Sequence, residues 1–255
     1  MRKVQEDPPK VAGVLRVLWY PSVTSTMDVA AEAVRNGAAA GVVIVADEQT
    51  AGRGRLGRAW SSPPGAGLYV SMILRPPLDD ERRVLSLVTL AAGVGVRDAI
   101  AAVAGLATEL KWPNDVIVGG RKLAGILAEG SSLGTTEQAI VVGIGINLLR
   151  SSHPPEIASR ATSIEQELRH SIDSKALLEA VLAGVTARYS DLCAGDGDGI
   201  LRAWRASSPS ADGARVEIVD GAKQGVTAGV DDNGALLVKT ASGTERVIAG
   251  ELKWL

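Results

Sequence analysis

The pattern of the sequence changes near Ser207, and this change limits the folds that the chain can adopt. Before that point, β-branched runs such as residues 41–46 (GVVIVA) alternate with segments of helical spacing such as residues 80–103. After it, short β runs separated by DG, DNG and SG turns are typical of a small barrel of about five strands. The sequence therefore predicts an α/β or α+β domain over residues 14–206, a β-barrel domain over residues 207–255, and a flexible lead-in over residues 1–13.

The same patterns predict the individual elements of the first domain. A helix should begin after Ser25, which can act as its N-cap, and end near Gly37. Gly93 and Gly95 interrupt the helical spacing of residues 80–103 and leave room for a bend or a close contact. We further expect strands over residues 14–20, 68–74 and 139–149, a helix over residues 174–193, a loop over residues 194–199 (AGDGDG), and a hairpin over residues 109–131 that turns at Gly119–Gly120.

Small counts exclude several catalytic mechanisms. The chain has two histidines and one cysteine. Cys193, His153 and His170 lack the short spacings of a zinc site, and no HExxH motif is present. A hydrolase that depends on histidine or cysteine is therefore not expected, and an enzyme of this composition must use lysine and arginine. The single cysteine excludes an internal disulfide and suits a reducing compartment.

The charge balance predicts a cytoplasmic protein that binds neither DNA nor a membrane. Lys and Arg number 27 against 29 Asp and Glu, so the net charge of −2 gives no basic field for nucleic acid. No run reaches the roughly 18 consecutive apolar residues of a membrane span. The first ten residues, MRKVQEDPPK, lack the apolar region of a secretory signal.

A loop rich in glycine and arginine is the most unusual segment. Residues 52–58 (GRGRLGR) match the G-x-G-x-x-G spacing of dinucleotide-binding loops, but the following AWSSPPGAG cannot form the helix that such a loop requires. What remains is three arginines on a flexible backbone: Arg53, Arg55 and Arg58. Guanidinium groups bind carboxylates and phosphates, so the loop could close over an anionic intermediate and exclude water. The alternative is a solvated surface loop without a function.

A second cluster of charged residues lies on the predicted hairpin. Residues 111–115 (KWPND) combine Lys111 with Asp115, and Lys122 on the returning limb should project near both. A compact lysine ammonium suits the carboxylate of an acid that is being activated, and Asp115 could hold a magnesium ion beside a triphosphate. The alternative is a strand that ends in a turn, with Trp112 in the core and the lysines in solvent.

Taken in order, these segments resemble the biotin protein ligases, also called holocarboxylase synthetases. The matching segments are residues 25–27, 49–60, 111–115, 121–129 and 143–147. The resemblance implies an α+β fold: a class II synthetase-like catalytic domain with a central mixed or antiparallel sheet flanked by helices, followed by an SH3-like barrel. It also implies that biotin and MgATP form biotinyl-5′-adenylate, from which biotin passes to a lysine of a biotin carboxyl carrier domain of acetyl-CoA carboxylase or a related enzyme.

The resemblance also implies roles for individual residues. Lys122, Arg55, Lys111 and Asp115 would be catalytic, with Lys122 at the biotin carboxylate and Asp115 at the metal. The implied biotin and adenylate site consists of Ser25, Thr26, Met27, Gln49, Gly52, Arg53, Gly54, Arg55, Lys122 and Gly125. The implied ATP site consists of Arg58, Trp60, Lys111, Asn114 and Asn147, with Trp60 near the adenine.

The sequence departs from this family at two places. Met27 stands where the family often has asparagine, which puts a side-chain contact to the biotin ring in doubt. Only 24 residues precede Ser25, fewer than the roughly 60 of the winged helix-turn-helix that bifunctional members carry, so we expect a ligase without repressor function. Both monomers and dimers occur in the family, and a homodimer is therefore compatible with it. Lys253 and Trp254 are expected to serve solvation and domain packing.

Two other functions compete with this interpretation. Lipoate ligases and octanoyl transferases share the implied fold but lack the paired GRGRxGR and KWPND motifs. A nucleic-acid-binding module could use the arginine loop and a small barrel. The absence of Phe, the three Tyr residues and the net charge all oppose that module, because stacking platforms and a basic surface are missing.

Overall fold

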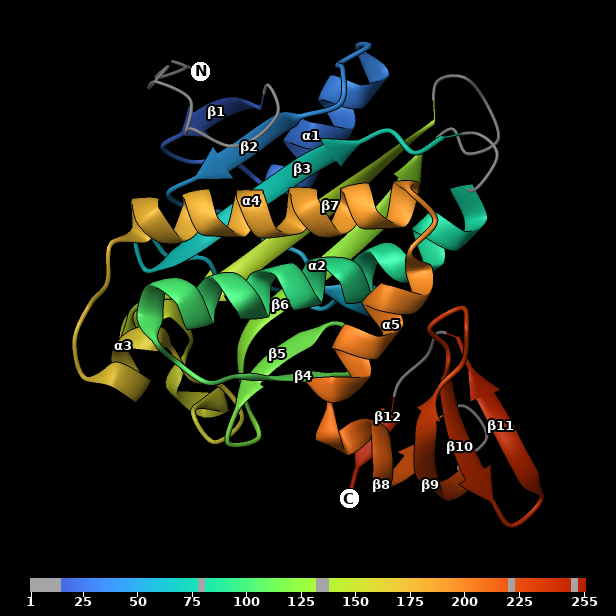
Figure 1. Ribbon diagram of the computed structural model, residues 1–255. Coiled ribbons are helices and arrows are strands. Elements are labelled where there is room, and N and C mark those ends of the chain that lie inside the picture. The colour runs from blue at the N-terminus through green and yellow to red at the C-terminus, as the bar shows by residue number, and fades with distance from the viewer. Residues whose placement is uncertain (1–14, 78–80, 132–137, 220–222, 249–251) are drawn as a thin grey trace.

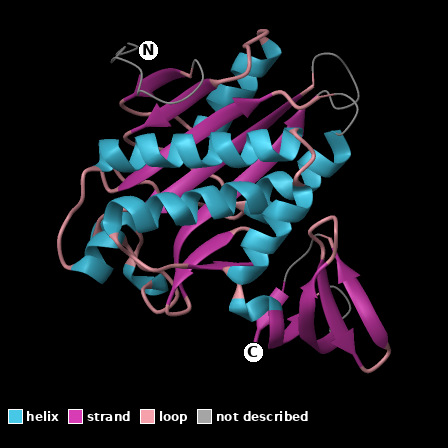
Figure 2. Ribbon diagram, in the orientation of Figure 1, coloured by secondary structure: helices cyan, strands magenta, loops and turns pink. Residues whose placement is uncertain are grey.

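The computed structural model describes residues 15–77, 81–131, 138–219, 223–248 and 252–255. The predicted flexible lead-in at residues 1–13 therefore lies outside the described residues. Figure 1 shows a large sheet with two long helices across one face and a smaller sheet beside it. Figure 2 shows the same separation: helices accompany the large sheet, whereas the smaller sheet consists of strands and loops. This arrangement confirms the predicted α+β fold.

The large sheet has seven strands in the order β1-β2-β3-β7-β6-β5-β4. Strands β1 and β2 pair in parallel, and each of the other neighbouring pairs is antiparallel. The sheet is therefore mixed but mostly antiparallel, as predicted. Its strands are β1 (Arg16–Tyr20), β2 (Val42–Ala46), β3 (Gly67–Leu74), β4 (Glu109–Lys111), β5 (Asp115–Val118), β6 (Arg121–Ser131) and β7 (Ala139–Asn147).

Alternation along the strands divides the apolar residues between the two faces of the sheet. In β2, Val43 and Val45 belong to the main hydrophobic core, whereas Ile44 packs in a smaller cluster on the other face. The same period of two places Ile144 of β7 in the main core and Val141 in the smaller cluster. Because both faces are covered, these strands read as continuous apolar runs in the sequence.

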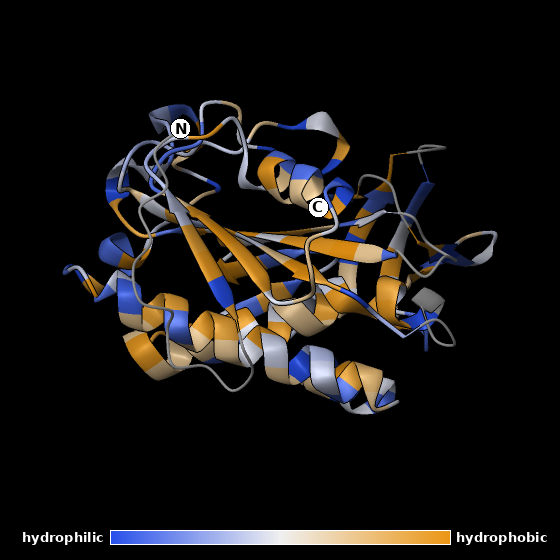
Figure 3. Ribbon diagram, turned by 90° about the horizontal axis from the view of Figure 1, so that it is seen from above, coloured by the Kyte–Doolittle hydropathy of each residue, from blue (hydrophilic) through white to orange (hydrophobic). Residues whose placement is uncertain are grey.

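Helices α2 (Glu81–Ala104) and α4 (Ser174–Cys193) cover the face that carries the main core. Figure 3, seen from above, shows these helices as a layer on one side of the apolar strands. The two helices approach so closely that a Cβ added to Gly95 would lie 2.8 Å from the backbone of Gly184. The predicted close contact at Gly95 is thus confirmed, whereas a Cβ at Gly93 would meet only Leu110, at 3.6 Å.

Helix α2 is as long and as apolar as a helix that spans a membrane. Among the described residues, Arg83–Ala104 is the one helix whose length and hydropathy would suffice to cross a bilayer. However, 61% of its most apolar window is buried within the protein. Packing against the sheet and α4 accounts for that apolar character.

Helix α1 (Thr26–Arg35) covers part of the opposite face. Its N-cap is Ser25, as predicted, whose hydroxyl accepts a hydrogen bond from the Met27 amide. The buried side chains of Met27, Ala30 and Val34 then face the smaller cluster. Because α1 has only ten residues, it packs on β2, β3 and β7 and leaves the region over β5 open.

The C-terminal sheet has five antiparallel strands in the order β11-β10-β9-β8-β12, which confirms the predicted number. The predicted DNG turn joins β9 to β10, with Gly234 at a φ of 77°. The indole nitrogen of Trp112 donates a hydrogen bond to the Gly234 carbonyl, 3.0 Å away, and so joins this sheet to the KWPND segment. The strands are β8 (Asp212–Ile218), β9 (Lys223–Val230), β10 (Leu236–Thr240), β11 (Gly243–Val247) and β12 (Leu252–Trp254).

Two local predictions were wrong. Residues 194–199 were expected as a loop, but α5 (Gly197–Ala206) begins inside them because the Asp196 carboxylate caps its first turn at the Gly199 amide. Residues 109–118 were expected as one limb of a hairpin, but they form the separate strands β4 and β5. The chain reverses at residues 112–114, and Lys111 pairs with Asp115. The Trp112–Pro113 bond is cis. The β5–β6 hairpin does turn at Gly119–Gly120, as predicted.

Candidate active site

A pocket of about 760 Å³ lies on the open part of the sheet face that α1 only partly covers. Strand register explains its position. Asp115 of β5 pairs with Gly125 of β6, Gly125 pairs with Gly145 of β7, and Gly145 pairs with Tyr69 of β3. Paired residues in a sheet point to the same face, so Asp115, Gly125 and Gly145 form a row across the floor of the pocket, and Tyr69 continues this row beyond its lining. Lys111 of β4 extends the row, because it pairs with Asp115.

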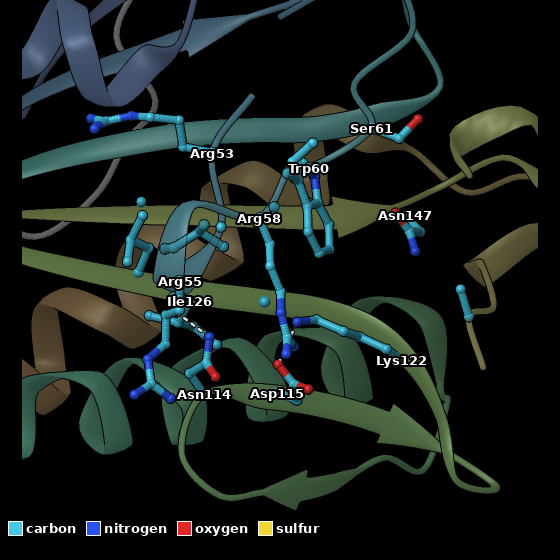
Figure 4. A pocket seen from close by; sticks show the side chains of 18 of the residues that line it. Arg53, Arg55, Arg58, Trp60, Ser61, Asn114, Asp115, Lys122, Ile126 and Asn147 are labelled. Carbon is cyan, nitrogen blue, oxygen red and sulfur yellow. Dashed lines mark hydrogen bonds and ion pairs between the residues drawn. The ribbon is translucent and has the colours of Figure 1, made fainter. Parts of the chain in front are cut away.

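The two glycines in this row make room for Trp60. A Cβ added to Gly145 would lie 2.6 Å from the Trp60 indole, and one added to Gly125 would lie 3.2 Å from it. Trp60 therefore lies directly on the backbone of β6 and β7, which gives the pocket a flat aromatic surface. Figure 4 shows this indole above the two strands, close to the Lys122 side chain. The Lys122 ammonium is 5.3 Å from the ring centroid.

A partly buried network of neutral polar groups also contributes to the pocket. Gln49 accepts hydrogen bonds through Oε1 from the amide and the hydroxyl of Thr26, at 2.9 and 3.2 Å. Its amide nitrogen donates to the hydroxyl of Ser62, at 2.7 Å. Ser71 of β3 donates to the Thr26 hydroxyl, at 2.8 Å. Ser62 and Ser71 were not predicted from the sequence, because neither lies in a recognisable motif.

The side wall beside this network is apolar. A Cβ added to Gly143 would lie 2.6 Å from the sulfur of Met27, so the Met27 side chain lies over the sheet at this glycine. Met27 is buried and lines the pocket together with Leu127. The structure therefore places Met27 in the wall of this pocket, where its side chain supplies an apolar surface.

Charged groups gather in the middle of the pocket. The Lys122 ammonium lies 2.5 Å from Oδ1 of Asp115. Figure 4 shows the Arg58 side chain reaching towards the same carboxylate. Among the described residues that line the pocket, Asp115 is the only acid, whereas the basic side chains are Arg53, Arg55, Arg58, Lys111, Lys122 and Arg160. The pocket therefore has an excess of positive charge that suits a polyanion.

Burial perturbs two of these cations. It lowers the pKa of Arg55 below its usual value, with Asp115 opposing this shift and Arg58 adding to it. Burial also lowers the pKa of Lys111, again opposed by Asp115 and reinforced by Lys122. Partly desolvated cations that repel one another bind an incoming anion more strongly than solvated ones do.

The loop that contains Arg55 is folded back on itself. The Gly54 amide donates to the Arg58 carbonyl at 2.7 Å, and a short 3₁₀ turn (Arg55–Gly57) carries the strongly exposed Leu56. Arg53 lies at the pocket edge, and its guanidinium pairs with Asp28 at 3.0 Å and Glu129 at 3.3 Å. Figure 4 shows Arg53 pointing away from the central charges.

Not every predicted residue presents a side chain to the pocket. Gly52 does not line it, and its role is close packing: a Cβ there would lie 2.4 Å from the Trp60 carbonyl. Asn114 and Asn147 line the pocket, but their amide nitrogens donate to the carbonyls of Ile126 and Thr162. These two asparagines therefore hold the walls in place. Ser25, Thr26, Met27, Gln49, Gly54, Arg55, Lys122 and Gly125 also line the pocket.

The C-terminal sheet contributes to the pocket through β12. Trp254 and Leu252 line it, and the Lys111 ammonium lies 4.8 Å from the centroid of the Trp254 ring. The expectation that Trp254 serves domain packing alone was therefore incomplete. Lys253 is exposed, as expected. A strand with a generic pattern gave no sequence signal that its last aromatic residue would reach the site.

Comparison with known protein families gives two matches. Residues 19–147 match the model of the biotin/lipoate A/B protein ligase family, and residues 213–252 match the model of the biotin protein ligase C-terminal domain. The first model alone covers both biotin and lipoate enzymes. The second model matches most of the residues that form the C-terminal sheet, whose strand β12 reaches the pocket.

Individual relatives agree with the family models. The bifunctional ligase/repressor BirA of Bacillus spizizenii is 33% identical over 240 residues, which cover 93% of this chain and 73% of that protein. The biotin–[acetyl-CoA-carboxylase] ligase of Paracoccus denitrificans is 33% identical, over 82% of this chain and 88% of its own length. Among solved structures, the biotin protein ligase from Aquifex aeolicus in complex with biotin and ATP has a TM-score of 0.80 and 28% identity, and the match covers 94% of this chain and 98% of that one.

Proposed function

This chain belongs to the biotin protein ligase family, and we propose that the pocket over the Gly125–Gly145 floor is where it joins biotin to ATP. The ligase activity has two steps: biotin and ATP form biotinyl-5′-AMP, and biotin is then transferred to a carrier of a biotin-dependent carboxylase. The observation that carries the site assignment is the meeting of Lys122, Arg58 and Asp115 beside a neutral polar network.

The polar network is suited to the ureido ring of biotin. That ring offers one carbonyl acceptor and two N–H donors, and the Thr26 hydroxyl and the Gln49 amide supply groups of both kinds. Met27 and Leu127 offer apolar contact for the remainder of the bicyclic ring and the aliphatic chain. A biotin bound in this orientation directs its carboxylate towards Lys122.

The central cations suit the first chemical step. A biotin carboxylate oxygen attacks the α-phosphorus of ATP, the bond from that phosphorus to the bridging oxygen breaks, and pyrophosphate leaves with the electron pair. Lys122, Arg55 and Arg58 stand where negative charge increases on the phosphate oxygens, so they stabilise the transition state more than the ground state. A carboxylate is already a nucleophile at neutral pH, and this step therefore needs no general base.

The second step uses the same adenylate as an acyl donor. The amine of the acceptor lysine attacks the carbonyl carbon of the mixed anhydride, an amide bond forms, and AMP leaves. The amine loses one proton in this step. We propose that the acceptor is a biotin carboxyl carrier domain of acetyl-CoA carboxylase or a related enzyme. We likewise propose that residues 14–206 form the catalytic domain and residues 207–255 a C-terminal domain that completes the nucleotide end through Trp254.

The pocket also suits a magnesium ion that arrives with ATP. Magnesium is usually held by one or two carboxylates together with substrate phosphates. Asp115 is the only carboxylate among the described lining residues, and these residues include no group of three or more His, Cys, Asp or Glu that could hold an ion without a substrate. Asp115 would therefore hold magnesium only with the phosphates, and the ion would shield their charge.

A substitution at Gln49 tests the placement of biotin. Gln49→Leu removes both the acceptor for Thr26 and the donor for Ser62. We expect biotin binding, measured by calorimetry without ATP, to weaken by roughly 5- to 150-fold, because about 1–3 kcal/mol is lost when a hydrogen-bonding group that is removed from water has no partner.

Arg121→Ala serves as the matched control for this experiment. Arg121 pairs with Glu167 outside the pocket lining, and its loss should leave biotin affinity unchanged. Unaltered biotin affinity in a folded Gln49→Leu variant would place biotin elsewhere. Lipoate in the same titration should give no heat at concentrations that saturate with biotin.

A further inference from the structure

The side chain of Trp254 reaches the pocket from β12, which is an edge strand of the C-terminal sheet. Trp254 pairs with Val216 of β8, and the amide of Leu255 donates a hydrogen bond to the Arg215 carbonyl at 3.0 Å. The side chain is partly buried and packs against the main hydrophobic core. Strand pairing therefore holds the backbone of Trp254, and core packing holds its ring.

Lys111 is the cation that lies over this ring. Its ammonium is 4.8 Å from the ring centroid, within the roughly 6 Å of a cation–π contact. Asp115, the only acid of the described pocket lining, lies 2.5 Å from the Lys122 ammonium. No described residue forms a hydrogen bond or an ion pair with the Lys111 ammonium. The Trp254 ring therefore holds Lys111 as the Asp115 carboxylate holds Lys122.

The two ways of holding a lysine leave different charges for a substrate. A carboxylate neutralises an ammonium and accepts hydrogen bonds from its N–H groups, whereas an aromatic ring attracts the ammonium and leaves its net charge in place. A lysine side chain is a flexible four-carbon stem, so an ammonium without any partner moves among many positions. The contact with Trp254 thus restricts the Lys111 ammonium while its charge stays available to an anion.

Both neighbours of Lys111 in the chain are also bonded to residues 207–255. The Leu110 amide donates to the Ser207 carbonyl at 2.7 Å. The Trp112 indole nitrogen donates to the Gly234 carbonyl at 3.0 Å. These two contacts fix the backbone of Lys111 relative to the C-terminal sheet, so the lysine and the Trp254 ring are held at a defined distance from each other.

We infer that Trp254 is a positioning residue for the first step, and that its ring holds the Lys111 ammonium where the phosphates of ATP bind. The inference rests on the proposed function, because it requires ATP in this pocket. Trp254 would act through Lys111, and it would not serve as a stacking surface for the base. Trp60, which lies directly on β6 and β7, already supplies a flat aromatic surface in the same pocket.

Replacement of Trp254 with leucine tests this inference, because leucine keeps an apolar side chain and removes the aromatic face. The measurement is kcat/KM for ATP, followed as pyrophosphate release at saturating biotin. We expect Trp254→Leu to lower it by roughly 2- to 30-fold, the range that the strength of cation–π contacts gives, mainly through a higher KM. Trp254→Phe keeps an aromatic face and should recover part of the loss.

A double-mutant cycle separates positioning of Lys111 from direct contact with the nucleotide. In a Lys111→Met background, the group that the ring holds is absent, so Trp254→Leu should lower kcat/KM for ATP little further. A tryptophan that itself contacts the nucleotide would cause the same loss in both backgrounds.

Trp19→Leu is the matched control, because Trp19 of β1 is also partly buried and packed against the main core but does not line the pocket. This variant should keep the wild-type kcat/KM for ATP. Biotin affinity without ATP should be unchanged in Trp254→Leu. If Trp254→Leu does not fold, proton NMR of the wild type still decides the question. The ε-methylene protons of Lys111, identified by their loss in Lys111→Met, should resonate upfield of those of the exposed Lys175.

Several results would overturn the inference alone. These are an unchanged kcat/KM for ATP in folded Trp254→Leu, an equal loss in both backgrounds of the cycle, a matching loss of biotin affinity, and Lys111 ε-protons that resonate with those of Lys175. A wild type that releases no pyrophosphate with biotin and ATP would overturn the proposed function, and the inference with it.

Discussion

Replacement of Lys122 with alanine is expected to slow biotinyl-adenylate formation by roughly 10²- to 10³-fold, the loss that follows removal of one preplaced group that stabilises developing charge. Lys122 is held on β6 by two backbone hydrogen bonds to the neighbouring segment, from its amide to the Arg160 carbonyl and from the Thr162 amide to its own carbonyl. These bonds hold the backbone of Lys122, and the ion pair with Asp115 holds its ammonium in the pocket. The rate of pyrophosphate release at saturating biotin and ATP measures the loss.

Two controls separate the charge of Lys122 from a structural role. Lys175→Ala removes an exposed lysine at the start of α4 and should leave the rate unchanged. The melting temperature of Lys122→Ala should stay close to that of wild type, because the lysine is partly exposed and its ion pair with Asp115 contributes little to stability. A normal rate of pyrophosphate release by a folded Lys122→Ala variant would show that Lys122 is not a catalytic residue.

Substitution of Gly95 with alanine is expected to destabilise the fold by about 1–3 kcal/mol, the usual cost of overpacking a tight contact. The added Cβ would lie 2.8 Å from both the Gly184 carbonyl carbon and the Val185 amide nitrogen. These are backbone atoms, so helices α2 and α4 must separate. Calorimetry should report a fall in melting temperature of roughly 2–4 °C for each kcal/mol.

Gly93→Ala is the matched control, because Gly93 lies two residues away in the same helix. Its Cβ would meet the Leu110 side chain at 3.6 Å, which is an ordinary contact. Alanine is favoured over glycine within a helix by about 0.5–1 kcal/mol, so this variant should melt at a higher temperature than wild type. We therefore predict that the melting temperature rises in Gly93→Ala and falls in Gly95→Ala. Equal changes of melting temperature in the same direction would contradict the described contact between α2 and α4.

The sequence predicts the strands and long helices of this fold well because apolar periodicity is strong in them. Residues 174–193 form α4 as expected, and the apolar run at residues 41–46 contains β2. The sequence does not predict which of the two glycines, Gly93 or Gly95, contacts a second helix, because that depends on packing between distant segments. It also does not predict the break between β4 and β5, where the chain reverses and Lys111 pairs with Asp115.

The sequence likewise predicts some residues of the candidate site and misses others. Motif residues such as Lys122, Asp115 and Trp60 do meet in one pocket. Residues outside the motifs were missed, although Ser71, Trp254 and His153 also line or support the pocket. Their positions follow from strand register, from the docking of the C-terminal sheet and from a proline-flanked turn. None of these features leaves a local signal in a single sequence.

The central claim is that this chain biotinylates a carrier, and the most direct test is mass spectrometry of the acceptor. The full chain is incubated with biotin, MgATP and an apo biotin carboxyl carrier domain of acetyl-CoA carboxylase. We predict that the carrier gains the mass of one biotinyl group, and that omission of ATP or replacement of the acceptor lysine with arginine prevents the gain. A carrier of unchanged mass, under conditions in which a control ligase modifies it, would contradict the account.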